Sequence, residues 1–437
     1  MRFSSTRDPR HTEVSFGEAI FRGLAPDGGL YHPTDEPDLR ALIRSFGDDT
    51  AFVDIAAALI QGLLPEDYDA TAARNLALRA FPFTPRLAEL EPGIALLELF
   101  HGPSCAFKDF GASFLAAAME DYLAERRSRA VILTATSGDT GSAVAHAFLN
   151  RENIDVVILY PSGKVSPLQE KQLTTLGGNV LALEVDGTFD DCQRMVKEAF
   201  VDESLKGRFN LTSANSINVG RLIPQSFYYV YAFAQLKEQI HDEIVFCVPS
   251  GNFGNLTAGI LAWRWGMPTS GFIAATNAND VVPEYLKTGV FSPRPSVSTL
   301  ANAMDVGNPS NFERLTALFL GEMLEITSLL SGTVVDDRLI AETMKDVWTK
   351  HGELICPHTA TGVYAARRHL ARERGSDATV VTLATAHPAK FIEVCRDNVG
   401  VEPEIPERLA RLLDLPKRSV PVGPTLEALR RALTEHL

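Results

Sequence analysis

The stretch EIVFCVPSGNFGN, residues 243–255, joins a continuous apolar run to a turn rich in glycine and asparagine. The run at 243–248 does not alternate polar and apolar residues, which is typical of a strand buried on both faces of a parallel sheet. The turn SGNFGN, residues 250–255, opens into a helical pattern from Asn255. A turn of this kind presents unpaired backbone N–H groups and the positive end of a helix dipole, and it therefore favours an anion.

The same layout of strand, tight turn and helix occurs twice more. The run AVILTA, residues 130–135, precedes TSGDTG, residues 136–141, and the run VVTLAT precedes AHPAKF, residues 386–391. Two glycine turns that open helices suggest two anionic groups, one on a cofactor and one on a substrate. Such turns are also common in α/β folds that bind nothing charged, so the pattern alone leaves both interpretations open.

Most of the apolar runs after residue 93 are continuous rather than alternating. They are predicted as strands of parallel sheets, with helical patterns between them. We therefore predict an α/β fold of doubly wound parallel or mixed sheets, with ligands at the carboxyl ends of the strands. The predicted strands cover residues 94–99, 130–135, 155–160, 179–185, 243–248, 271–276 and 378–384.

The first 92 residues differ from the rest, because prolines and helical runs replace the apolar strands. We expect helices near 38–46, 51–63 and 66–79, and a linker at FPFTP, residues 81–85, where two prolines break any helix. The expected organisation has three parts: a mainly helical N-terminal unit over 1–92, a large cofactor-binding α/β domain over 93–110 and 234–437, and a small α/β domain over 111–233.

Composition excludes several classes of function. The 437 residues carry 41 Lys and Arg against 55 Asp and Glu, and a net charge of −14 repels nucleic acid and anionic lipid. The five cysteines are scattered and form no CxxC pair, which favours free thiols in the cytoplasm over disulfides or a metal site. The N-terminus has no apolar signal segment, and the apolar run at 51–64 is too short to span a bilayer.

Lys108 lies in HGPSCAFKDFG, residues 101–111, between Phe107 and Phe110. Apolar neighbours desolvate an amine and lower its pKa, as a Schiff-base lysine requires. An arbitrary lysine beside aromatic residues is far more often a surface residue. The distant 250–255 turn changes this balance, because an imine-forming lysine and a phosphate-binding turn together suggest pyridoxal phosphate. No metalloprotease, serine-hydrolase or P-loop motif competes with this interpretation.

Seven segments in unbroken order resemble the threonine synthase family, whose members are pyridoxal-phosphate enzymes of the tryptophan-synthase-β-like fold (fold type II). The match extends over almost the whole chain. The segments are SSTR (4–7) with SFGEAIFRGLAPDGGLYHP (15–33), HGPSCAFKDFG (101–111), TATSGDTGSA (134–143), PSGKVSPLQEKQLTTLGGNV (161–180), NSINVGRL (215–222), PSGNFGN (249–255) and TAHPAKF (385–391).

The resemblance implies a role for each matching position. Lys108 would be the Schiff-base lysine, and Thr385 would face the pyridine nitrogen of pyridoxal phosphate. The cofactor phosphate would be held by Ser250, Gly251, Asn252, Phe253, Gly254 and Asn255. The phosphate of the substrate, O-phospho-L-homoserine, would be bound by Thr136, Ser137, Thr140, Asn215, Ser216 and Arg221. Arg221 suits that phosphate because a guanidinium binds it in a bidentate manner, and Lys164 is a second-tier candidate.

The implied reaction is the last step of threonine biosynthesis, in which O-phospho-L-homoserine and water give L-threonine and phosphate. Lys108 would remove the α-proton and later move protons at Cβ and Cγ, phosphate would leave Cγ, and water would add at Cβ. In this family the departing phosphate is thought to help activate that water. The expected partner is this small molecule alone, for a monomer or a homodimer that needs no metal.

Two alternatives remain open at this point. A phospho-lyase on the same fold would give 2-oxobutyrate, ammonia and phosphate without adding water at Cβ. A silent binding protein would be expected to lose Lys108 or the 250–255 turn, and both are intact. Departures from the family pattern are small: Ser104 and Cys105 replace a threonine and an aliphatic residue. Asp139 stands where the plant-like branch carries asparagine, so activation by S-adenosylmethionine is not expected.

Overall fold

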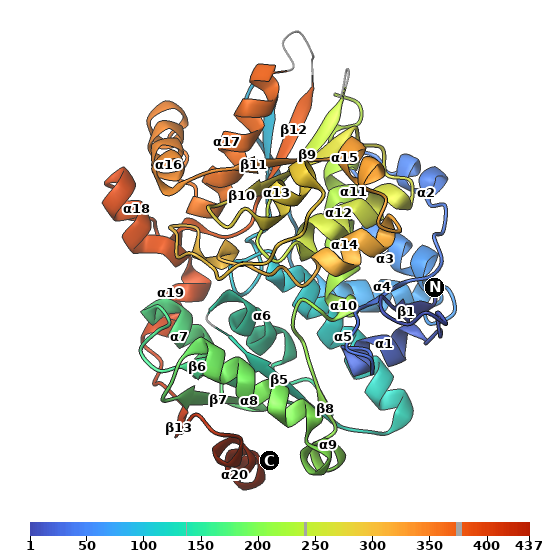
Figure 1. Cartoon of the computed structure of the whole chain (residues 1–437), viewed down its shortest axis with the longest axis vertical. Coiled ribbons are helices and arrows are strands. Elements are labelled where there is room, and N and C mark those ends of the chain that lie inside the picture. Colours follow the sequence, from blue (N-terminus) through green and yellow to red (C-terminus); the bar gives the residue numbers. More distant parts are fainter. Residues whose placement is uncertain (137, 240–242, 373–377) are drawn as a thin grey trace.

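Two sheets with helices on their faces form the two ends of the molecule in Figure 1. The structure is a computed structural model, and it describes residues 1–136, 138–239, 243–372 and 378–437. The predicted α/β fold is confirmed, and the strands that were predicted over 130–135 and 271–276 coincide with β5 and β10.

The larger sheet of the described chain has six strands in the order β11-β10-β9-β12-β4-β3. All neighbours are parallel except β3 and β4, so the sheet is mixed. Every residue of β4, β9 and β10 is buried, as expected for continuous apolar runs covered on both faces. The strands are Arg86–Glu91 (β3), Ile94–Glu98 (β4), Ile244–Pro249 (β9), Gly271–Thr276 (β10), Leu330–Val334 (β11) and Thr379–Ala384 (β12).

The smaller sheet has five described strands in the order β13-β7-β6-β5-β8, and all its neighbours are parallel. Its centre is apolar: every residue of β5 is buried, and β6 is buried except at Asp155. The strands are Ala130–Ala135 (β5), Ile154–Pro161 (β6), Val180–Val185 (β7), Leu211–Thr212 (β8) and Val420–Val422 (β13).

The N-terminal region is mainly helical, as predicted, and it lies beside both sheets in Figure 1. Its two short strands, Phe3–Ser5 (β1) and Tyr31–Pro33 (β2), pair with each other. The apolar run at 51–64 forms a buried helix that packs on α4 (Ala70–Ala80) and on α11 (Gln225–Leu236). The helices here are Phe16–Arg22 (α1), Arg40–Ser45 (α2), Phe52–Leu63 (α3) and Ala70–Ala80 (α4).

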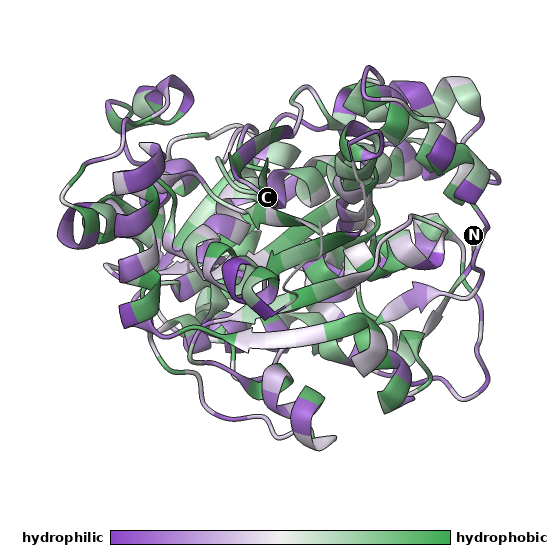
Figure 2. Cartoon of the chain, turned by 90° about the horizontal axis from the view of Figure 1, so that it is seen from above, coloured by the Kyte–Doolittle hydropathy of each residue, from purple (hydrophilic) through white to green (hydrophobic). Residues whose placement is uncertain are grey.

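The remaining helices cover the two sheets, and Figure 2 shows hydrophobic strands inside with hydrophilic residues on the helices around them. No helix in the described ranges is long and apolar enough to cross a membrane. The helices are Lys108–Arg126 (α5), Asp139–Phe148 (α6), Pro167–Thr174 (α7), Phe189–Val201 (α8), Glu203–Phe209 (α9), Val219–Leu222 (α10), Gln225–Leu236 (α11), Gly254–Arg264 (α12), Val281–Thr288 (α13), Asn302–Met304 (η1), Phe312–Leu318 (α14), Met323–Leu329 (α15), Asp337–His351 (α16), Pro357–Arg372 (α17), Pro388–Phe391 (η2), Ile392–Val399 (α18), Glu407–Leu413 (α19) and Leu426–His436 (α20).

Two strands join a sheet other than the one that the predicted domain boundaries imply. Strand β3 falls within the N-terminal unit predicted over 1–92, yet it pairs with β4 of the larger sheet. Strand β13 falls within 234–437, yet it pairs with β7 of the smaller sheet, and α20 packs on α8. Both strands are edge strands, so their sequences lack the continuous apolar pattern that marks a buried strand.

Candidate active site

Lys108 is the first residue of α5, directly after a loop that leaves the carboxyl end of β4. Local contacts fix this loop. The backbone N–H of Ser104 donates to Asp109 Oδ2 at 2.9 Å, and the N–H of Phe107 donates to the carbonyl of Thr385 at 2.9 Å. The lysine therefore lies where the loops after β4 and β12 meet, at the edge of the sheet where ligands were expected.

The amine of Lys108 is surrounded by protein. Its Nζ lies 3.5 Å from Asp139 Oδ2 and 5.5 Å from the ring centroid of Phe107, and the side chain is 18% exposed. Burial lowers the pKa of Lys108, repulsion from Lys390 and Arg221 acts in the same direction, and Asp139 opposes both. The predicted desolvation is thus present, although Phe110 turns away to pack against Phe52, Phe83 and Tyr228.

Asp139 is the carboxylate that pairs with the amine of Lys108 among the described residues, and it lies in the first turn of α6. Its Oδ1 is 2.7 Å from Lys390 Nζ and accepts a hydrogen bond from Gln169 Nε2 at 3.0 Å. Burial alone raises the pKa of Asp139, but Lys390 and Lys108 outweigh it, so the pKa lies well below its usual range. Asp139 is therefore ionised and shared by two lysines.

The 250–255 turn follows the carboxyl end of β9 and leads into α12, as predicted. The N–H of Ser250 donates a hydrogen bond to the carbonyl of Ala275. Within the described ranges, the backbone N–H groups of the next five residues, Gly251 to Asn255, have no hydrogen-bond acceptor. Five free donors at the start of a helix fit a phosphate group.

The side chains of the 250–255 turn hold it against its surroundings. Asn252 accepts from the Ser310 N–H at 2.7 Å and donates to Ser216 Oγ at 2.7 Å. Asn255 Oδ1 accepts from the hydroxyls of Tyr228 at 2.5 Å and Tyr229 at 2.8 Å. The Nδ2 of Asn255 is buried without a described partner, which leaves one more donor for a ligand.

The residues present therefore fit pyridoxal phosphate: a desolvated lysine, a turn of free N–H donors, and Thr385. Thr385 is buried and follows the last residue of β12. Its hydroxyl makes no hydrogen bond to any residue that the structure describes. A free hydroxyl beside the Lys108 loop can serve the ring nitrogen of the cofactor, as the resemblance implied.

The 136–141 turn was predicted to bind the substrate phosphate, and its hydrogen bonds are largely internal. The hydroxyl of Thr136 accepts the N–H groups of Gly138 at 3.0 Å and Gly141 at 2.9 Å. Thr140 is half-buried, and its side chain makes no hydrogen bond among the described residues. Ser137 lies outside the described residues.

Arg221 was also predicted to bind that phosphate, and it is a buried cation without a described ion-pair partner. It donates to the carbonyl of Ala214 at 2.8 Å and to the carbonyl of Lys108 at 3.4 Å, while its Nε has no partner in the described chain. Burial lowers the pKa of Arg221 to about 10. An unpaired buried guanidinium is costly, so the geometry favours an anionic ligand here.

The other predicted ligands of the substrate phosphate, Asn215 and Ser216, contact residues of two different strand ends. Asn215 Oδ1 accepts from Thr134 Oγ1 at 2.5 Å, and Ser216 is bound to Asn252. Lys164, the second-tier candidate, is exposed. Sequence reasoning assigned no role to Lys390 or to Asp139, although both stand in quoted motifs. A local motif does not reveal that two distant residues form a buried ion pair.

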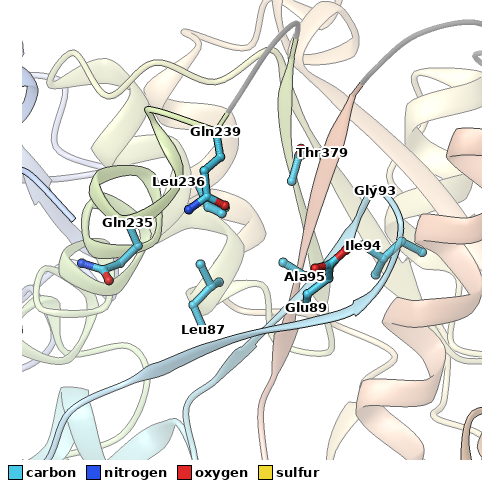
Figure 3. Close-up of a pocket in the computed structure, with 9 residues that line it drawn as sticks. All are labelled: Leu87, Glu89, Gly93, Ile94, Ala95, Gln235, Leu236, Gln239 and Thr379. Atoms are coloured by element: carbon cyan, nitrogen blue, oxygen red, sulfur yellow. The ribbon is translucent and has the colours of Figure 1, made fainter. Parts of the chain in front are cut away.

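A cavity of about 370 Å³ lies away from this site (Figure 3). Its lining includes Gly93, Ile94 and Thr379, at the amino ends of β4 and β12, whereas Lys108 and Thr385 follow the carboxyl ends of these strands. The cavity therefore belongs to the opposite edge of the larger sheet.

Three family models match the chain: "Threonine synthase N terminus" over residues 2–81, "Pyridoxal-phosphate dependent enzyme" over 81–386, and "Threonine synthase, C-terminal" over 359–433. Among curated relatives, threonine synthase of Serratia marcescens is 42% identical over 99% of both chains. That of Escherichia coli K12 is 41% identical over the full length of both.

Solved structures agree over the same length. The Escherichia coli threonine synthase structure has a TM-score of 0.90, with 41% identity and complete coverage of both chains. A pyridoxal-phosphate-bound threonine synthase from Brucella melitensis has a TM-score of 0.94 and 35% identity, covering 100% of this chain and 99% of that one. The predicted arrangement of fold type II is thereby confirmed.

Proposed function

The chain belongs to the threonine synthase family of pyridoxal-phosphate-dependent enzymes, and on this premise we propose that it converts O-phospho-L-homoserine and water to L-threonine and phosphate. One observation supports the assignment of residues: besides the desolvated amine of Lys108, the protein has two separate sets of anion-binding donors that have no anionic partner among the described residues. One set is the N–H groups of residues 251–255, which follow the carboxyl end of β9, and the other is the guanidinium of Arg221, which donates to the carbonyl of Lys108.

Each set of donors suits a different phosphate. The N–H groups of Gly251 to Asn255, with Ser250 before them, would hold the cofactor phosphate at the start of α12. Arg221 would hold the substrate phosphate, with Asn215 Nδ2 and the Thr140 hydroxyl as further donors, since neither group has a hydrogen-bond partner among the described residues. Ser216 would fix the distance between the two phosphates, because its hydroxyl already accepts from Asn252.

When bound, pyridoxal phosphate supplies the electron sink that makes protons next to the substrate's amino-bearing carbon acidic. Lys108 would hold the cofactor, and its amine would take the proton from Cα and later move protons at Cβ and Cγ. A neutral amine can act as a base, and burial favours the neutral form. Arg221 binds the phosphate that leaves Cγ, before water adds at Cβ. Thr136 holds its turn through the N–H groups of Gly138 and Gly141.

The test is incubation of the purified holoenzyme with O-phospho-L-homoserine, with phosphate and L-threonine assayed together. Equal amounts of both products are expected. Phosphate with 2-oxobutyrate and no threonine would instead identify a phospho-lyase. No phosphate from protein that carries its cofactor would contradict the assignment of the substrate.

We further propose that the protein works in the cytoplasm as a monomer or a homodimer. All five cysteines are free and buried, which suits a compartment that keeps thiols reduced. Light scattering after gel filtration should give a mass of one or two chains of 47.7 kDa, and a larger assembly would contradict the proposal.

A further inference from the structure

Lys390 is a lysine without exposed side-chain surface, in the short η2 helix that follows β12. Its Nζ lies 2.7 Å from Asp139 Oδ1 and donates to the carbonyl of Ser104 at 2.8 Å. Burying an ion pair costs desolvation energy that the attraction of the two charges does not reliably recover. A fully buried pair next to a reactive amine therefore suggests a role other than stability.

The carboxylate of Asp139 is shared. While Oδ1 serves Lys390 and Gln169, Oδ2 faces Lys108 Nζ at 3.5 Å. Two lysines thus compete for one carboxylate, and Lys390 has the shorter contact. Without Lys390, the whole negative charge of Asp139 would act on Lys108 and stabilise its ammonium form.

We infer that Lys390 is a positioning residue that acts on Lys108 through Asp139. It binds the carboxylate, and so it leaves Lys108 in the neutral form that can take a proton from the substrate. When Lys108 takes the Cα proton, it becomes an ammonium ion beside Asp139 Oδ2. When it delivers the proton to a later carbon, it returns to the neutral amine.

Further ionisable groups around this trio lie on α5, α6, α10 and α17; burial lowers the pKa of His146 on α6 to about 4, and the pKa of His387 before η2 is lowered to about 4 in the same way. Arg221 on α10 repels a proton on Lys108, and Asp109, next to Lys108 on α5, is buried, with its pKa raised to about 6 by burial. His358 on α17 is neutral near pH 7, because burial lowers its pKa to about 4. The charge of Lys390 lowers the pKa of Lys108 and also that of Asp109, so both pKa values are expected to rise when Lys390 is replaced.

Each substitution should change the pKa of Lys108 in a definite direction. Lys390→Met removes a positive charge and leaves Asp139 to Lys108, so the pKa of Lys108 should rise. In the double variant Lys390→Met/Asp139→Asn the carboxylate is absent too, so the pKa should fall back toward that of the unaltered protein. In Asp139→Asn alone, Lys108 loses the nearby anion and keeps the repulsion from Lys390. The pKa of Lys108 should therefore fall below its value in the unaltered protein.

Two measurements report this pKa in the full chain. One is the pH profile of kcat/KM of the holoenzyme. The other is the pH midpoint for acylation of Lys108 by acetic anhydride after removal of the cofactor, with the modified lysine located by mass spectrometry. Lys390→Met should move the acid limb and the acylation midpoint up by about one pH unit, or ~tenfold in rate on the acid side. The double variant should largely reverse this shift.

A role that is merely structural would give a different pattern. An unmoved midpoint in Lys390→Met, or an equal shift in the double variant, would overturn the inference. If Lys390→Met fails to fold, Asp139→Asn supplies the test through its downward shift, and an unchanged or higher midpoint there overturns the inference as well. The pH profile of kcat/KM depends on the proposed function, whereas the acylation midpoint does not. Loss of threonine formation in every protein, with the acylation midpoints still shifted, would contradict the proposed function and leave the inference standing.

Discussion

The 250–255 turn and the 136–141 turn have the same layout of strand, glycine-rich turn and helix, yet they satisfy their hydrogen bonds in different ways. The N–H groups from Gly251 to Asn255 are free of described acceptors. In the other turn, the hydroxyl of Thr136 takes two of the N–H groups, and an acidic residue, Asp139, occupies the first turn of the helix.

This difference teaches that a glycine turn before a helix does not by itself identify a ligand site. The 250–255 turn leaves its donors for an external anion, whereas the 136–141 turn uses an internal hydroxyl and brings its own carboxylate near the helix N-terminus, which also favours a negative charge. The second turn therefore supplies Asp139 beside Lys108, and Thr140 stays a predicted ligand.

The largest expected effect comes from Lys108, the proposed link to the cofactor. Lys108→Ala should lower turnover by about a thousandfold or more, because the amine that is proposed to link to the cofactor and move the protons is lost. The visible absorbance of the lysine-linked cofactor should disappear as well. Lys206→Ala, at an exposed position on α9, is the control. Unchanged absorbance in Lys108→Ala would remove this residue from the cofactor site.

The next effect distinguishes the site of the substrate phosphate from the site of the cofactor phosphate. Arg221→Ala should weaken binding of O-phospho-L-homoserine by about 2–4 kcal/mol, because a charge-assisted pair with the phosphate is lost. The affinity for pyridoxal phosphate, measured by equilibrium titration, should stay the same because the 250–255 turn is untouched. An unaltered KM for the phosphorylated substrate would exclude Arg221 from its site.

A smaller effect, on cofactor affinity, is expected from filling the space between the 250–255 turn and Met304. A Cβ at Gly251 would lie 2.6 Å from the Cα of Met304, so Gly251→Ala must displace the turn. We expect the dissociation constant for pyridoxal phosphate to rise about tenfold, or ~1.4 kcal/mol. The matched control is Gly207→Ala on α9, where the added Cβ meets nothing within 4 Å. An equal cofactor affinity in both variants would mean that the position of the turn does not matter for the cofactor.

The smallest effect tests whether the second turn is held internally. Thr136→Val keeps the shape of the side chain but removes the acceptor of two N–H groups, which should lower the free energy of unfolding by about 1–2 kcal/mol. Urea unfolding measures this change, and Thr136→Ser, which keeps the hydroxyl, should retain most of the stability. If the two variants are equally stable, the internal hydrogen bonds of this turn contribute little.

The local patterns predicted the central strands well and the edge strands poorly. The runs at 130–135 and 271–276 match β5 and β10 because a strand buried on both faces must be apolar throughout. Strand β11, which contains Gly332, and strand β13, which contains Pro421, escaped prediction. At an edge only one neighbour constrains the sequence, so the pattern there is weak.

The sequence by itself determined the α/β fold, the family, and the motifs that carry Lys108, Arg221 and the 250–255 turn, because these depend on residues close together in the chain. The tertiary structure alone decided that Lys390 meets Asp139 and that Asn252 meets Ser216. Hydrogen bonds and ion pairs depend on distances of a few ångströms between atoms. For residues far apart in the sequence, such distances exist only after the two sheets have brought their loops together.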